Sequence, residues 1–272
     1  MVRYVGLERR GLDDSYHRLL TMPFAAFIGL MALAYLLINA LFALLYMLEP
    51  GSVAGARPGN FGDYFFVSVQ TLGSLGYGAM GPQTVYAHLL MTFESFVALF
   101  NIAIATGLMF ARISRPTARI MFSNIAVIAP FDGVQALMFR AANQRRNMVV
   151  EAEVSVNIAR DIVTSEGLSM RRFYDLAVVR PRTPLFFLTW QVIHRIDADS
   201  PLYGETPESL AAQDAEILVV MKGVDETFAS TIHARGTYGA SDIVWGRHLA
   251  DIIVDQDDGG SLIDFTRFHD AS

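Results

Sequence analysis

A glycine-rich run lies between two long apolar segments of the sequence: Ser74, Leu75, Gly76, Tyr77 and Gly78. Non-helical backbone is tolerated at membrane depth only where it is buried in protein or lines a water-filled cavity. The carbonyl oxygens of such a backbone can replace the water around a cation if successive peptide groups point the same way. That arrangement needs positive φ at alternate residues, which glycine adopts without steric cost. The run therefore predicts a loop that coordinates a cation through its backbone carbonyls.

Two apolar segments flank this loop and would have to position it. Residues 24–48 contain no charged residue, and residues 85–111 are interrupted only by His88 and Glu94. At about 1.5 Å rise per residue, each segment would be long enough as a helix to span a bilayer core. The first is longer than the apolar core of a signal peptide, and no clear cleavage site follows it. Two membrane-spanning helices are therefore predicted, and Glu94 is an intramembrane acid with either a functional or a structural role.

Before the glycine run, residues 61–72 are apolar and aromatic but too short to span a membrane. A stretch of about a dozen apolar residues is more typical of a re-entrant or buried helix. Asp63, near its start, would favour the positive end of the helix dipole, and the far end would present partial negative charge to the loop. These features predict a short pore helix directed at a cation.

The distribution of basic residues predicts the orientation in the membrane. Between the two apolar segments, residues 49–84 carry Arg57 as their one basic residue. The other flanking basic residues are Arg3, Arg9, Arg10 and Arg18 before the first segment, and Arg112, Arg115 and Arg119 after the second. By the positive-inside rule, both termini are expected to be cytoplasmic.

The remaining chain divides into an N-terminal segment and a C-terminal domain. Apolar residues recur at helical spacing in residues 11–22, which predicts an amphipathic helix on the inner leaflet. The alternative is a frayed extension of the first membrane helix. The predicted boundaries are residues 1–22 for the cytoplasmic N-terminus, 23–115 for the transmembrane pore domain and 116–272 for the cytoplasmic domain.

From Arg119 onward the pattern changes to short segments with period-two alternation and turn signals. Strand-like segments without long helices between them predict an immunoglobulin-like β-sandwich of antiparallel sheets. Residues 206–215 form the one plausible short helix there, with Thr206 as its cap and Glu208 and Ser209 in the first turn. The chain has no cysteine, which excludes disulfides and cysteine-ligated metals and fits a cytoplasmic domain.

Several words of the sequence resemble the bacterial inward-rectifier potassium channel (KirBac-type) family: GYGAMGPQTVYAH, GLMFARISRP, DSPLYGETPESL and GVDETFASTIHAR. The resemblance extends from about Leu12 to His269. It implies an α+β membrane protein that assembles as a four-fold homotetramer in the bacterial inner membrane. It also implies that K⁺ is the permeant ion, that no cofactor is needed, and that neither nucleic acid nor a small-molecule substrate is a partner.

In this family the glycine run is the selectivity filter. The resemblance implies that Ser74, Leu75, Gly76 and Tyr77 offer carbonyls to K⁺ and that Gly78 completes the filter. The family usually has threonine at position 74 and a β-branched residue at position 75. Serine loses a methyl group there, and leucine loses the stiffness of a β-branched side chain. Selectivity for K⁺ is therefore expected to be real but less strict.

Further positions match the family's gate and lipid contacts. Cavity and gate positions are Ile102, Thr106, Gly107 and Phe110, of which Phe110 matches the aromatic ring at the bundle crossing and Gly107 a hinge. Since a single phenylalanine with this spacing more often contacts lipid, the gate role depends on the resemblance. Anionic headgroups are expected to bind at Arg112, Arg115 and Arg119, although arginines there also simply satisfy the positive-inside rule.

Two other functions remain open from the sequence. One is a weakly selective cation channel of the same architecture, which Leu75 favours. The other is a membrane-anchored sensor whose β domain binds a ligand or partner, although this leaves residues 61–82 without a role. An enzyme is not expected, because the six histidines are scattered and no nucleophile–base pair or metal-ligand spacing is present.

Overall fold

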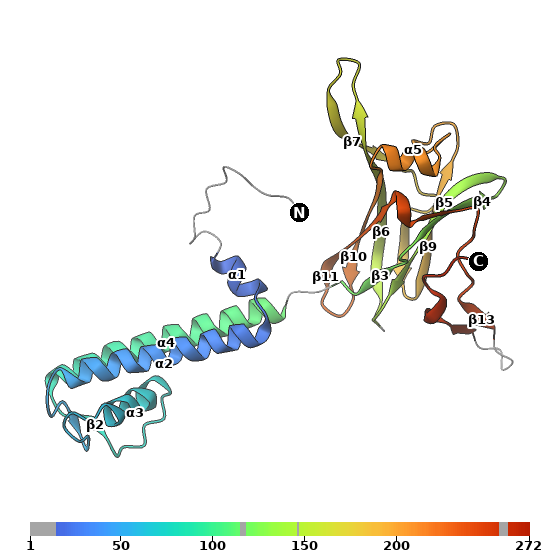
Figure 1. Cartoon of the computed structure of the whole chain (residues 1–272). Helices are drawn as coiled ribbons and strands as arrows, with labels where there is room; N and C mark the ends of the chain where they lie inside the picture. The colour runs from blue at the N-terminus through green and yellow to red at the C-terminus, as the bar shows by residue number, and fades with distance from the viewer. Residues whose placement is uncertain (1–14, 115–117, 146, 256–260) are drawn as a thin grey trace. The chain divides into compact units, whose positions relative to one another are not determined.

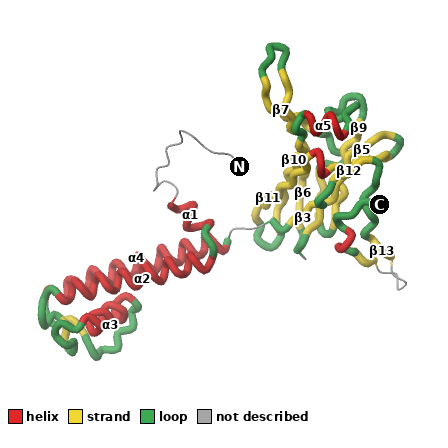
Figure 2. The backbone as a smooth tube through the Cα atoms, viewed as in Figure 1, coloured by secondary structure: helices red, strands yellow, loops and turns green. Residues whose placement is uncertain are grey.

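The structure is a computed structural model that describes residues 15–114, 118–145, 147–255 and 261–272 (Figure 1). The chain divides into two compact units, Met1–Arg115 and Pro116–Ser272, which are described separately below. Helices fill the first unit, and strands dominate the second (Figure 2).

The described residues of the first unit form two long helices, two short helices and a two-stranded ladder. In chain order its elements are α1 (Ser15–Thr21), α2 (Phe24–Met47), β1 (Val53–Ala54), α3 (Phe61–Leu72), β2 (Gly81–Pro82) and α4 (Val85–Ile113). Helices α2 and α4 lie side by side, and α3 packs against both at one end of the pair (Figure 1). Each of the two long helices is long and apolar enough to cross a membrane. Both lie where the sequence predicts membrane-spanning helices, and α1 occupies the described part of the predicted amphipathic segment.

Capping side chains determine where α3 and α4 begin. Asn60 precedes α3, and its side-chain oxygen accepts a hydrogen bond from the Asp63 amide at 3.4 Å. The Asp63 carboxylate accepts two bonds from the Arg57 guanidinium, each 2.9 Å long. Thr84 caps α4 in the same way, because its hydroxyl accepts from the Ala87 amide at 3.2 Å. Such caps satisfy amides that the first helical turn leaves without partners.

A short antiparallel ladder joins the chain on either side of α3. Val53 pairs with Pro82, and Ala54 pairs with Gly81. The Gln83 amide donates to the Ser52 carbonyl at 2.8 Å and extends this contact. The ladder closes residues 55–80 into a loop whose two ends are fixed between α2 and α4.

The second unit contains two five-stranded sheets. One has the order β11-β10-β6-β7, with β8 also paired to β6, and the other has the order β12-β4-β5-β3, with β9 also paired to β5. The first sheet consists of β6 (Val149–Val163), β7 (Ser169–Asp175), β8 (Arg182–Phe186), β10 (Glu216–Asp225) and β11 (Ser230–Gly239). The second consists of β3 (Ile120–Phe122), β4 (Ala126–Phe131), β5 (Val134–Asn143), β9 (Thr189–Ile196) and β12 (Ile243–Trp245). The remaining elements are α5 (Pro207–Ala212), η1 (Ala240–Asp242), β13 (Ile253–Asp255), β14 (Ser261–Ile263) and η2 (Phe265–Arg267).

The inner faces of the two sheets form a common apolar core. Side chains of β5 and β9, such as Phe139 and Trp190, are buried in the same cluster as Ile158 of β6 and Met221 of β10. This is the layered arrangement expected when period-two strands bury one face each. Strand β12 departs from an antiparallel sandwich, because it runs parallel to β4. Helix α5 is shorter than the predicted residues 206–215, and Thr206 caps it as predicted, forming a capping box with Ser209.

His194 has a defined structural role in the second unit. His194 is buried, and its Nδ1 lies 2.7 Å from the Ala177 carbonyl while its Nε2 lies 2.7 Å from the Ser200 hydroxyl. Since a carbonyl only accepts, Nδ1 carries the proton and Nε2 accepts from Ser200. Burial lowers the pKa of His194, which favours this neutral form.

Candidate functional site

Residues 73–78, called the glycine loop below, follow directly from the C-terminal end of α3. Three alternate residues have positive φ: Ser74 at 54°, Gly76 at 58° and Gly78 at 77°. The values at Gly76 and Gly78 are those that a carbonyl-coordinating backbone needs. Positive φ at Ser74 was not predicted, because serine rarely adopts this conformation.

The end of α3 explains why Ser74 adopts it. The Ser74 amide donates to the Thr71 carbonyl at 3.1 Å, and the Leu75 amide donates to the Gln70 carbonyl at 2.8 Å. These two bonds are the Schellman pattern, in which a left-handed residue ends a helix and its last carbonyls find partners. Ser74 stands where glycine is usual. The alternation of positive φ therefore begins as the helix cap of α3 and continues into the glycine loop.

The side chains of the glycine loop face away from the chain's own core. Leu75 is 52% exposed and Tyr77 is 75% exposed within the single chain. A cavity of about 360 Å³ adjoins the loop. It is lined by α3, the loop, the strand after it and α4: Val67, Gln70, Thr71, Ser74, Gly76, Gly78, Met80, Gly81, Pro82, Met91 and Ser95. No acidic or basic side chain is among these residues, so the surroundings of the loop are uncharged there.

Three helices are joined by buried polar side chains close to this site. Glu94 of α4 accepts a hydrogen bond from the Tyr46 hydroxyl of α2 at 2.8 Å, and its other oxygen lies 2.5 Å from the Ser68 hydroxyl of α3. Ser68 also lies 3.0 Å from the side-chain oxygen of Asn39 on α2. All four side chains are fully buried. These contacts support a structural role for Glu94. The sequence did not predict Tyr46 and Ser68 as its partners.

The candidate cavity and gate residues share one face of α4. Ile102, Thr106 and Phe110 recur four residues apart, and Gly107 adjoins them. All four are exposed in the single chain, with Phe110 at 72%. We expect a face this exposed to be covered either by lipid or by further copies of the chain.

The three arginines considered for lipid binding have different surroundings. Arg112 turns toward α1, where its guanidinium donates to the Leu19 carbonyl at 2.8 Å and to the Met22 carbonyl. It also lies over the Phe27 ring, 5.1 Å from the centroid. Arg119 is exposed in the second unit, and Arg115 lies outside the described residues. Arg112 therefore ties α1 to the end of α4, a contact that sequence spacing could not predict.

Replacing Arg112 with glutamine should release α1 from α4. Each hydrogen bond from a charged donor contributes about 1.5–3 kcal/mol, and the shorter neutral side chain loses both. Because the chain has no cysteine, a single spin label at Tyr16→Cys, an exposed position on α1, reports its mobility without background. We expect a more mobile label in Arg112→Gln. Arg18→Gln, which changes an exposed arginine of α1 itself, should leave the spectrum unchanged, and equal mobility in all three proteins would contradict the tie.

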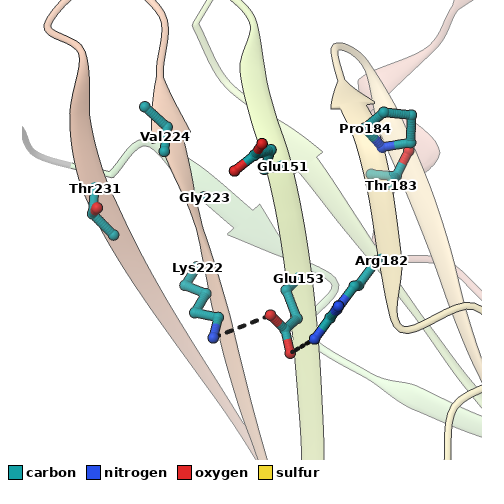
Figure 3. A pocket seen from close by; sticks show the side chains of 9 residues that line it. All are labelled: Glu151, Glu153, Arg182, Thr183, Pro184, Lys222, Gly223, Val224 and Thr231. Atoms are coloured by element: carbon teal, nitrogen blue, oxygen red, sulfur yellow. Dashed lines mark hydrogen bonds and ion pairs between the residues drawn. The ribbon is translucent and has the colours of Figure 1, made fainter.

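A second hollow, of about 610 Å³, lies on the β6, β8, β10 and β11 sheet (Figure 3). Glu153 there bridges two cations, Lys222 at 3.1 Å and Arg182 at 3.5 Å. Glu151 projects from the same strand and has a positive φ of 51°. The sequence did not single out these residues as a site.

Comparison with known proteins agrees with this architecture. The sequence profile described as the inward rectifier potassium channel C-terminal domain matches residues 120–272. The chain is 43% identical over 269 residues to the inward rectifier potassium channel Kirbac3.1 of Paramagnetospirillum magnetotacticum, which covers 98% of this chain and 91% of that protein. It is 34% identical over 219 residues to the inward rectifier potassium channel 4 of Homo sapiens, over 75% of this chain. The matched part spans 48% of that human protein, about half its length.

One solved structure with a partly similar fold shares far less sequence. The sporulation control protein Spo0M from Bacillus subtilis aligns over 49% of this chain and 51% of its own, with 11% identity and a TM-score of 0.27. A likeness at that level supports no statement about function.

Proposed function

Since the chain belongs to the inward rectifier potassium channel family, we propose that it conducts K⁺ passively through a pore formed around the glycine loop. The family consists of ion channels, so the chain is a potassium-selective channel and not an enzyme. The two long apolar helices agree with a membrane protein. K⁺ is then the permeant ion, and no cofactor is assigned.

The observation that carries this proposal is the alternation of positive φ at Ser74, Gly76 and Gly78. A filter replaces the hydration shell of the ion with carbonyl oxygens, and an alternating backbone can direct successive carbonyls to one side. We assign K⁺ binding to Ser74, Leu75, Gly76 and Tyr77, with Gly78 completing the filter. Helix α3 is then the re-entrant pore helix, whose C-terminal end carries partial negative charge next to the ion.

A homotetramer follows from the same assignment. One copy of the glycine loop offers carbonyls from one direction, whereas a dehydrated cation needs oxygens around it. Four copies about a four-fold axis would supply them. They would also cover the exposed side chains of the loop and the exposed face of α4. In that assembly Ile102 and Thr106 line the cavity, Gly107 allows bending and Phe110 closes the path at the bundle crossing.

The location, the domain boundaries and the lipid partners of the chain are also part of this proposal. We propose the inner membrane of a bacterium as the location, with both termini in the cytoplasm. Residues 1–22, 23–115 and 116–272 are proposed as the N-terminal segment, the pore domain and the cytoplasmic sandwich. Anionic lipid headgroups are the proposed partners of Arg115, Arg119 and the N–H groups of Arg112 that α1 does not use. Neither nucleic acid nor a small-molecule substrate is assigned as a partner.

Liposome flux tests the proposed function directly. Purified protein in vesicles loaded with K⁺ should take up Rb⁺, and Ba²⁺ should block that uptake. Because Ser74 and Leu75 replace the usual threonine and β-branched residue, external Na⁺ should compete weakly but measurably. The variant Leu75→Val should lower Na⁺ competition by about threefold, since a β-branched side chain restricts χ1 and stiffens the loop. Position 74 is left unchanged, because a β-branched threonine is strained at the positive φ that Ser74 adopts.

Three outcomes separate the alternatives. Absence of Rb⁺ uptake in wild type and in Leu75→Val would exclude a channel and favour a membrane-anchored sensor. Equal reversal potentials in Na⁺ and K⁺ gradients would indicate a weakly selective cation channel. Unchanged Na⁺ competition in Leu75→Val would contradict the role assigned to position 75.

A further inference from the structure

Asn39, Tyr46, Ser68 and Glu94 form a buried cluster in which the Glu94 carboxyl group can be either ionised or protonated. Among the ion pairs of the described residues, none includes Glu94. Helix α2 contains no charged residue, and the basic residue nearest in sequence to α3, Arg57, is paired with Asp63. An ionised carboxylate buried without a cation is costly, because its hydration is lost and no opposite charge replaces it.

If Glu94 is ionised, the cluster has one proton too few to form all of its hydrogen bonds. The Ser68 hydroxyl has one proton but lies within hydrogen-bond distance of two oxygens, at 2.5 Å from Glu94 and 3.0 Å from Asn39. The side-chain oxygen of Asn39 cannot be exchanged with its nitrogen, because that nitrogen donates to the Tyr35 carbonyl at 2.7 Å. One of the two buried contacts of Ser68 would then join two oxygens without a proton, which is unfavourable in a buried site.

A single additional proton completes every contact. If Glu94 carries it on Oε1, that oxygen donates to Ser68, and Ser68 then donates to Asn39. Asn39 donates to the Tyr35 carbonyl, and the Tyr46 hydroxyl donates to Oε2 of Glu94. Each buried donor then has an acceptor, and the chain of bonds runs in one direction from α4 through α3 to α2. Such continuous networks are the favourable form of buried polar groups.

We infer that Glu94 is held as the neutral acid and is the positioning residue for α3, and so for the glycine loop that follows it. Ser68 lies on the last turns of α3, and Leu72 at its end leads into the loop. A proton shared between α4 and α3 fixes the position of α3 without placing a net charge beside the permeant ion. This inference rests on the proposed function only for its consequence for flux, and the protonation can be measured independently.

Infrared spectroscopy tests the protonation. The full-length channel is purified in an alkyl maltoside, a detergent without carbonyl groups, at neutral pH, where ordinary exposed carboxyl groups are ionised. We expect a carboxylic-acid C=O stretching band in wild type that is absent in Glu94→Gln. Glu208→Gln, which removes an exposed acid of α5, should keep the band. An acid band of equal intensity in wild type and Glu94→Gln, or none in either, would overturn the inference.

Rb⁺ uptake with Na⁺ competition tests the positioning role. Glutamine mimics the neutral acid, because its amide can donate to Ser68 while its oxygen accepts from Tyr46, so Glu94→Gln should remain within about twofold of wild type. Glu94→Asp keeps the carboxyl group but retracts it, and should lower uptake or K⁺ preference at least about fivefold, because a buried partner is left unsatisfied. Ser68→Ala removes the bonds from α3 to both Glu94 and Asn39, and should raise Na⁺ competition more than Tyr46→Phe, which removes only the bond between α2 and Glu94.

The opposite order of variants would overturn the positioning role. If Glu94→Asp retains flux and selectivity while Glu94→Gln loses them, a negative charge rather than a neutral acid is required. If Ser68→Ala and Tyr46→Phe have the same effect, the cluster supports folding in general and not α3 in particular. A wild-type protein without K⁺ or Rb⁺ flux would contradict the proposed function, while the infrared comparison would still decide the protonation.

Discussion

Replacing Gly76 with alanine is expected to reduce Rb⁺ uptake about a thousandfold. A Cβ at this position would meet nothing within 4 Å in the single chain, so steric clash is not the reason. The cause is the φ of 58°, which an L side chain adopts at a cost of about 1–2 kcal/mol. Four identical loops would add that cost to about 4 kcal/mol or more, and each 1.4 kcal/mol changes a population tenfold.

Gly81→Ala is the matched control. A Cβ there also meets nothing within 4 Å, but the φ of Gly81 is not positive. Uptake should therefore stay close to wild type, although Gly81 lies only a few residues further along the chain. Thermal unfolding of both tetramers distinguishes loss of conduction from loss of assembly. Wild-type uptake and Na⁺ competition in a properly assembled Gly76→Ala channel would refute the assignment of residue 76 to the filter.

Replacing Phe110 with alanine is expected to raise basal K⁺ flux by about tenfold. In the proposed tetramer four Phe110 rings close the path by excluding water, and their removal destabilises the closed state. A loss of about 1.4 kcal/mol from that state is enough for a tenfold change in the open population. The flux of each variant through identical vesicles, normalised to reconstituted tetramer, measures the effect.

Phe100→Ala is the control for this experiment. Phe100 is also an exposed phenylalanine of α4, but at 3.6 residues per turn it points roughly 80° away from Phe110. Its ring lies 4.7 Å from that of Phe96, so it has a packing partner within the same helix. Its removal should change basal flux by less than twofold if the gate is specific to the Phe110 face. Equal increases in both variants would indicate a general loosening of α4 instead.

The membrane helices, α3 and the strand-rich domain could be predicted because they depend on local patterns. Charge-free length predicts the span of α2, and period-two alternation predicts the sheets. The positive φ of Gly76 and Gly78 follows from residue type. Positive φ at Ser74 could not be predicted in the same way, because it depends on the bonds that end α3.

Contacts between residues far apart in the chain could not be predicted from the sequence. Tyr46 and Ser68 lie 48 and 26 positions from Glu94, and nothing in their spacing indicates a shared cluster. Asn39 was the available signal, since a side-chain amide within a charge-free membrane helix needs a partner. Arg112 was predicted to bind lipid headgroups, and its position gave no sign that it also bonds the carbonyls of Leu19 and Met22. The parallel pairing of β12 with β4 likewise joins segments more than a hundred residues apart, which periodicity cannot specify.

The small ladder between β1 and β2 separates the filter segment from the rest of the chain. It fastens both ends of residues 55–80, so this stretch is a cassette with its own closure, set apart from the far end of α4 where Arg112 bonds α1. Under the proposed assignment, the residues that bind the ion lie within the cassette and the gate lies outside it. A lineage of such channels could therefore exchange one filter for another without changing its gate, provided that Asn39, Tyr46 and Glu94 of the flanking helices still hold α3.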